Sequence, residues 1–83
     1  MIGRIVCSKA GRDKGMFMVV LGDKEGKLLV AEGKERPVEN PKHKNPKHLM
    51  FTNTYLEVKQ YSTNKSLRRA LREYRNVAEQ EED

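Results

Sequence analysis

Short apolar runs, separated by glycine-bracketed polar turns, fill the first half of the chain. Residues 2–8 are rich in β-branched side chains, residues 16–21 are uniformly apolar, and residues 27–32 form a third short run. The run at 16–21 is too short for a stable helix, so we expect a strand with both faces at least partly covered. Glycine tolerates the positive φ angles of tight turns, which predicts chain reversals at 9–15 and 22–26. The pattern predicts an antiparallel meander of three strands.

All three prolines and both histidines fall between residues 33 and 48. Proline lacks an N–H and fixes φ, so this stretch is predicted to be a stiff, extended loop and neither a helix nor a central strand. Residues 49–51 and 54–58 then combine Thr, Tyr, Phe and Val, which prefer a pleated surface. They are predicted to form one or two closing strands.

The hydrophobic period becomes that of a helix after residues 62–64, which are three good N-cap residue types in a row. The apolar stripe of this helix is made of Leu67, Ala70, Leu71, Tyr74, Val77 and Ala78. Basic residues project from the other side with a rhythm of three or four residues, namely Lys65, Arg68, Arg72 and Arg75. Only Arg69 departs from that rhythm. Acidic residues at the carboxyl end oppose the helix dipole, so we expect fraying soon after Val77.

The length of 83 residues accommodates one domain with a thin core. Hydrophobic residues make up 36% of the chain and charged residues 35%, a balance too apolar for a disordered chain and too charged for a deep enzyme pocket. The 17 basic residues outnumber the 12 acidic ones, and all 17 lie within residues 1–76, which hold only eight acids. A folded part this basic favours a polyanionic partner.

Cys7 is the single cysteine, so an intramolecular disulfide is impossible and nothing indicates an oxidising compartment. The chain shows neither a signal peptide nor a membrane span, which predicts a cytoplasmic protein with no membrane partner. Cys7, His43 and His48 match no structural zinc spacing, and we expect neither a metal nor a cofactor. Paired carboxylates, a nucleotide-binding loop and a Ser/His/Asp set are also missing, so we expect no enzymatic activity.

Four consecutive segments carry a recognisable order of strand, basic loop, strand and strand. They are Gly3-Arg4-Ile5-Val6, Gly11-Arg12-Asp13-Lys14-Gly15, Phe17-Met18-Val19-Val20-Leu21 and Leu28-Leu29-Val30. Together they resemble a KOW motif, with Gly15 at the motif's hallmark glycine, over roughly residues 2–52. The order of features beyond the motif is similar to that of KOW-bearing large-subunit ribosomal proteins of archaea and eukaryotes. The length and the helical tail resemble short bacterial KOW proteins that bind RNA.

The resemblance implies an SH3-like barrel that binds RNA or ribonucleoprotein. The predicted fold is therefore mainly β, a small SH3-like antiparallel barrel over residues 1–60 with a C-terminal α-helix. The basic amphipathic helix is expected over 61–78, and the acidic tail over 79–83 is expected to be disordered.

Three groups of basic residues are candidates for contact with an RNA backbone. The loop 9–15 holds cations on a glycine-framed turn, and the segment 39–48 repeats Asn-Pro-Lys-His at 40–43 and 45–48. The helix arginines are suited to bidentate phosphate contacts. The candidate RNA-binding residues are Lys9, Arg12, Lys14, Lys34, Arg36, Lys42, His43, Lys44, Lys47, His48, Arg68, Arg69, Arg72 and Arg75.

Each group also has a structural interpretation, as a charged hairpin loop, a proline-stiffened surface loop or a solvated helix face. The hypothesis is a monomeric RNA-binding protein, associated with the ribosome or ribosomal RNA, that contacts structured RNA. The aromatic residues are mostly core candidates, which favours backbone contacts over stacking on an unpaired strand. The alternative is a protein-interaction adaptor of the translation or transcription machinery. Double-stranded DNA is a third possibility, although the sequence lacks a groove-reading motif.

Overall fold

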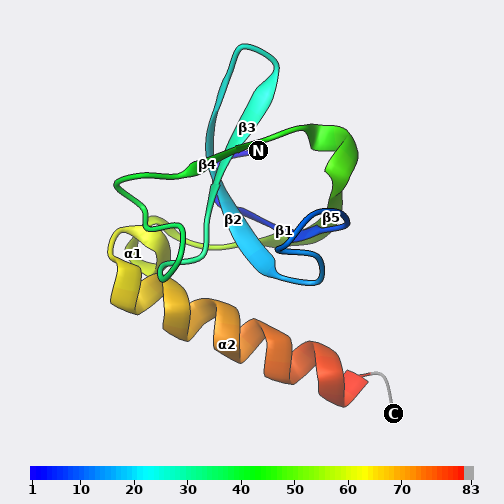
Figure 1. Ribbon diagram of the computed structural model, residues 1–83. Helices are drawn as coiled ribbons and strands as arrows, with labels where there is room; N and C mark the ends of the chain where they lie inside the picture. The colour runs from blue at the N-terminus through cyan, green and yellow to red at the C-terminus, as the bar shows by residue number, and fades with distance from the viewer. Residues whose placement is uncertain (82–83) are drawn as a thin grey trace.

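Five antiparallel strands form one curved sheet, and a long helix packs across one of its faces (Figure 1). The computed structural model describes residues 1–81, with side chains through residue 78. The sheet order is β4-β3-β2-β1-β5. The strands are β1 (Arg4–Ser8), β2 (Phe17–Lys24), β3 (Lys27–Ala31), β4 (Lys42–Lys44) and β5 (Leu49–Tyr55).

The predicted meander is confirmed, because β1 pairs with β2 and β2 pairs with β3 in antiparallel register. Glu25 and Gly26 make the tight turn between β2 and β3, both at positive φ (53° and 82°). The ladders shift register between Arg4 and Val6 in β1 and between Val20 and Gly22 in β2. Such irregularities bend and twist a strand, which curls the sheet.

The mainly β fold with a C-terminal helix is therefore confirmed. The two edge strands β4 and β5 follow each other in the chain, joined through the short 3-10 helix η1 (Pro46–His48). They share no ladder within residues 1–81, so the sheet is open at this point.

The prediction of an uninterrupted loop over residues 33–48 is wrong for its second half, which contains β4 and η1. β4 lies at the edge of the sheet and pairs only with β3, so the preceding Pro41 removes no hydrogen bond that the ladder needs. Pro46 occupies the start of η1, where a helix has no use for the missing N–H. The side chain of Asn45 caps this turn by accepting from the backbone N–H of Lys47 at 2.9 Å.

The strand expected at residues 54–58 ends at Tyr55, and the short helix α1 (Val58–Tyr61) follows. The backbone N–H of Glu57 donates to the side-chain oxygen of Gln60 at 2.8 Å, and the N–H of Gln60 donates to the Glu57 carbonyl at 2.8 Å. These two bonds stabilise one helical turn against the strand preference of Val58.

The core consists of two apolar clusters, one on each face of the sheet. The first cluster fills the inside of the curl with Val6, Met18, Val20, Leu28, Val30 and Leu49. The second cluster lies between the sheet and α2 (Asn64–Glu81), with Ile5, Val19, Ala31, Leu67 and Leu71. β2 is thus covered on both faces, as its apolar run predicted. Cys7 is also buried, and burial raises the pKa of its thiol.

The helix α2 begins where the sequence predicted. Thr63 and Ser66 cap it reciprocally, since the N–H of Ser66 donates to Thr63 Oγ1 and the N–H of Thr63 donates to Ser66 Oγ. The helix reaches Glu81, past the expected fraying point at Val77, and residues 82–83 of the acidic tail lie outside the described residues. Neither α1 nor α2 has the length and apolar composition that crossing a bilayer requires.

Candidate nucleic-acid interface

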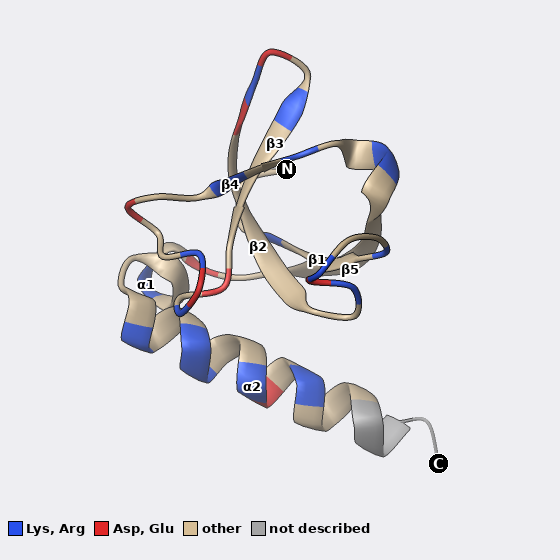
Figure 2. Ribbon diagram, viewed as in Figure 1, with Lys and Arg blue, Asp and Glu red and all other residues tan. Residues whose placement is uncertain are grey.

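A groove of about 570 Å³ runs between α2 and the loops that adjoin β2 and β3, and we call it the arginine groove. Its lining combines apolar and charged side chains, namely Met16, Phe17, Glu32, Lys34, Arg68, Leu71, Arg72 and Arg75. The four cations come from two elements far apart in sequence, the loop after β3 and the middle of α2. Figure 2 shows basic segments along α2 and in the loops above it.

The loop that carries Lys34 is fixed to the start of α2 by close packing. Gly33 has φ +92°, and a Cβ there would lie 2.7 Å from the Asn64 carbonyl oxygen. The backbone N–H of Val38 donates to Asn64 Oδ1 at 2.8 Å. These contacts explain how Lys34 comes to face the helix arginines.

The predicted arginines of α2 play different parts. Arg68 donates from Nη1 to the Gly33 carbonyl at 2.6 Å and so helps to hold the loop. Arg72 and Arg75 are exposed and have no carboxylate partner among the side chains that the structure describes. Arg69 lies on another side of the helix, near Lys59 and Glu73, and does not line the arginine groove.

A second, smaller groove of about 210 Å³ adjoins the first, because Met16 lines both. We call it the loop groove. It is lined by Arg12, Asp13, Met16, Met18, Glu35, Arg36 and Lys42. The two grooves together bring seven of the predicted cations into one region, namely Arg12, Lys34, Arg36, Lys42, Arg68, Arg72 and Arg75. We call this region the basic surface.

Asp13 anchors the loop 9–15 to β4 through a nearly buried charge cluster. Its two carboxylate oxygens accept from Lys44 Nζ at 2.7 Å and from Lys42 Nζ at 3.1 Å, and Ser8 Oγ donates at 2.7 Å. Burial alone would raise the pKa of this carboxyl group. The hydrogen bonds from Lys44, Ser8 and Lys42 outweigh burial and hold the pKa of Asp13 well below its ordinary value.

This cluster corrects one sequence-based interpretation. The Lys44 side chain is only 7% exposed, and its Nζ also donates to the Ala10 carbonyl at 3.0 Å. Two of its donors are thus satisfied inside the protein, so Lys44 cannot reach an RNA phosphate without breaking the cluster. Lys42 can both stabilise the cluster and contact RNA, because its side chain bonds Asp13 and is still 31% exposed.

The remaining predicted residues are exposed, but none lines the basic surface. Lys9 and His48 are neighbours, since the Lys9 N–H donates to the His48 carbonyl at 2.8 Å. This bond joins the loop 9–15 to η1, which also carries Lys47. As RNA contacts these five residues stay predictions, namely Lys9, Lys14, His43, Lys47 and His48.

Sequence reasoning did not select Arg4, Phe17 or Glu32. Phe17 and Glu32 line the arginine groove, and the only signal for them was their place at the ends of strands beside basic loops. Arg4 lies over the rings of Phe51 and Tyr55, at 5.3 and 5.6 Å from their centroids, and its Nε donates to the Thr52 carbonyl at 2.6 Å. Arg4 therefore ties β1 to β5 and is not part of the basic surface.

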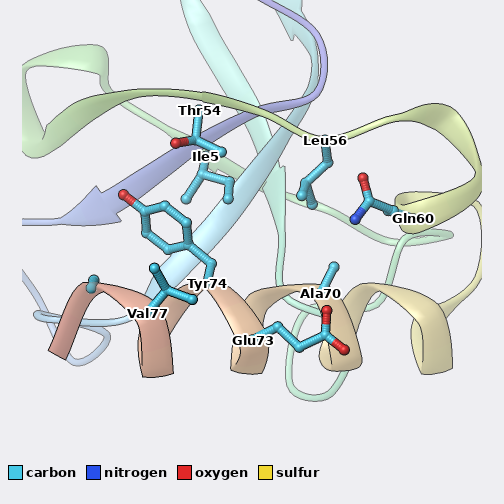
Figure 3. Close-up of a pocket in the computed structure, with 9 residues that line it drawn as sticks. Ile5, Thr54, Leu56, Gln60, Ala70, Glu73, Tyr74 and Val77 are labelled. Atoms are coloured by element: carbon cyan, nitrogen blue, oxygen red, sulfur yellow. The ribbon is translucent and has the colours of Figure 1, made fainter. Parts of the chain in front are cut away.

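A third groove, of about 420 Å³, lies between α2 and the end of β5, and Figure 3 shows its lining. It is mainly apolar, with Ile5, Leu56, Tyr74 and Val77 around it, and it holds no Lys or Arg. Val77 is 53% exposed. The helix α2 therefore borders a basic groove and an apolar groove with different residues.

No protein-family model matches the chain, and no curated protein sequence is significantly similar to it. Membership of the KOW family and binding to RNA therefore stay proposals. Their support comes from the position and charge of the side chains described above.

Proposed function

We propose that this protein binds structured RNA through the basic surface. The observation that carries the proposal is the convergence of Lys34, Arg72 and Arg75 on one groove, with a second basic groove beside it. The two grooves hold seven cations against three acids, Asp13, Glu32 and Glu35, an excess of four positive charges. Asp13 is moreover already neutralised by lysine. Such an excess attracts a polyanion over distances of about a Debye length, roughly 10 Å at 0.1 M salt.

Phosphate contacts supply most of the binding free energy in this proposal. Arg72 and Arg75 are three residues apart on one helix, so they are neighbours on its surface. Each guanidinium can donate two parallel hydrogen bonds to a phosphate. With about four to six phosphates contacted, affinity falls steeply with salt, and selectivity for sequence is weak.

The same proposal includes an SH3-like barrel of the KOW type that acts on the ribosome or on ribosomal RNA. The curled sheet supports it, because β4 and β5 are joined end to end through η1 around one apolar cluster. The loop 9–15, which the KOW resemblance places at the RNA, is held rigid by Asp13 and contributes Arg12 to the loop groove.

Binding to naked ribosomal RNA fragments tests the proposal. We expect the protein to shift such fragments in a native gel at low salt and to release them as salt rises. The logarithm of the binding constant should fall linearly with the logarithm of salt concentration. A protein that ignores naked RNA and binds only assembled ribosomal particles would contradict the proposal.

The alternative function, an adaptor that docks on a ribosomal or polymerase subunit, is favoured by one observation. The groove between α2 and β5 presents apolar side chains to solvent, with Val77 more than half exposed. The two functions separate in the same experiment, since an adaptor requires the protein subunit and tolerates salt.

A further inference from the structure

The arginine groove is more than a line of cations, because its floor is apolar. Met16, Phe17 and Leu71 line it, and Phe17 is half-buried. The Phe17 ring is held edge-on against Tyr74, with the ring centroids 5.3 Å apart at an angle of 74°. A volume of about 570 Å³ falls within the range of small-ligand sites. A groove that met only the phosphates of a duplex would gain nothing from an apolar floor.

Glu32 is the second feature that a phosphate-binding groove does not explain. It is half-buried, and its Oε1 accepts from the backbone N–H groups of Lys34 at 3.0 Å and Arg36 at 2.6 Å. These bonds fix the orientation of a carboxylate whose residue lines the groove. Among the described side chains Glu32 makes no salt bridge, although four cations line the same groove. A carboxylate at this point repels phosphate and attracts an N–H donor.

We propose that the arginine groove takes one unpaired nucleotide of the RNA, and that its base carries an exocyclic amino group. The base lies against the floor of Met16, Phe17 and Leu71. Its amino group donates to the free oxygen of Glu32, while its phosphate contacts Arg72 and Arg75. Unpaired bases at loops and bulges are the part of an RNA that proteins read by stacking and by hydrogen bonds to base edges.

Cytosine and uracil make the sharpest distinction. Cytosine presents an amino group at the position where uracil presents a carbonyl oxygen. A carboxylate accepts from the first and repels the second. The inference rests on the proposed function and adds a preference to it, for a bulged cytidine over a bulged uridine on the same stem.

The experiment compares three labelled RNA hairpins by fluorescence anisotropy: a fully paired stem, the stem with one bulged cytidine, and the stem with one bulged uridine. We expect the bulged cytidine to bind at least about fivefold more tightly than the bulged uridine. The fully paired stem should bind no better than the bulged uridine. All three should weaken with salt.

Two matched variants identify the residue responsible. Glu32→Gln keeps an oxygen for the two backbone N–H groups and gives the amide a donor for uracil, so the preference for cytidine should disappear. Glu35→Gln removes the same charge from the neighbouring loop groove. It should strengthen binding to all three hairpins and leave the ratio between them unchanged.

The outcomes separate the two claims. Salt-dependent binding with equal affinity for the two bulges, or equally tight binding of the paired stem, overturns this inference and leaves the proposed function standing. Loss of the cytidine preference in Glu35→Gln as well as in Glu32→Gln also overturns it. Failure of all three hairpins to bind the native protein overturns both claims. The comparison with the native protein decides the base preference even if Glu32→Gln does not fold.

Discussion

The lysines of β4 and the arginines of α2 have the same sign of charge and opposite environments. Lys42 and Lys44 meet Asp13, and Lys44 is buried to the point of being a core residue. Arg72 and Arg75 are exposed over a groove and meet no described carboxylate. The sequence alone made both pairs equal candidates for RNA contact.

The difference is one of chain geometry. Residues two apart on a strand share a face, so Lys42 and Lys44 both point at the loop 9–15, where a single acid can reach them. Residues three or four apart on a helix share a face. On α2 that spacing gathers Arg68, Arg72 and Arg75 along one groove. Whether a basic side chain is available to bind RNA therefore depends on whether the fold brings an acidic side chain next to it.

The largest expected effect follows from removing Asp13. In Asp13→Ala the buried Lys44 keeps its charge and loses its closest anionic partner, which costs about 3–5 kcal/mol. A domain of this size is stable by only a few kcal/mol more than that, so the variant should stay folded in water but unfold at a much lower urea concentration than the native protein. Urea denaturation followed by circular dichroism measures the loss.

Glu35→Ala is the control for this variant, because Glu35 is exposed and makes no salt bridge with any side chain that the structure describes. Its unfolding free energy should stay within about 0.5 kcal/mol of the native value. A loss below about 1 kcal/mol in Asp13→Ala would show that the charge cluster does not hold β4 in place.

Reversing the charge of Arg72 and Arg75 together should lower RNA affinity about a hundredfold, because two charge-assisted phosphate contacts become repulsions. The matched control reverses Lys59 of α1 and Arg69 of α2, which line a different groove from Arg72 and Arg75. It makes the same change in net charge and should weaken binding only a few-fold. Equal losses in the two variants would mean that net charge, and not the arginine groove, determines binding.

Acid should weaken the fold through Asp13. Its pKa is below the ordinary value of 3.8 in the folded state, so its contribution is complete above that value and is lost as the pH falls below it. We expect the unfolding free energy to fall on acidification below about pH 4, and to fall less steeply in Asp13→Asn. The same slope in both proteins, measured by urea denaturation at several pH values, would contradict the assignment.

The smallest expected effect is that of Lys44→Met on RNA affinity. The variant removes a charge that cannot reach RNA, so the folded protein should bind within about twofold of native, as expected for a lost long-range contribution alone. Filter binding at low salt measures this. A loss comparable to that of the arginine variant would place Lys44 at the RNA and remove the distinction between the two regions.

The sequence predicted the elements that local patterns determine. The meander and the start of α2 follow from apolar periodicity, glycine turns and capping residues, and all are found. It missed β4, η1 and α1, whose formation depends on an available sheet edge and on individual capping bonds. It also missed the role of Asp13, although the alternation of Lys42 and Lys44 was a signal that a strand would point both at one partner.

The arginine groove was predicted in part. The rhythm of Arg68, Arg72 and Arg75 was visible, and so was the exception at Arg69. The position of Lys34 across from them was not, because it depends on the close approach of Gly33 to Asn64. Glu32 precedes Gly33 and reaches the groove through that same approach, whereas Phe17 reaches it by packing against Tyr74. Their place at strand ends was a weak signal, and the contacts themselves join segments far apart in the sequence.

The most direct measurement is a nuclear magnetic resonance titration of the native protein with a naked RNA hairpin. The side-chain Nε–Hε signals of Arg72 and Arg75 and the backbone amides of residues 32–36 should move. The amides of Arg69 and Val77, on the other sides of α2, should stay in place. Movement confined to the groove between α2 and β5, or the absence of any movement at low salt, would contradict the claim that RNA binds the basic surface.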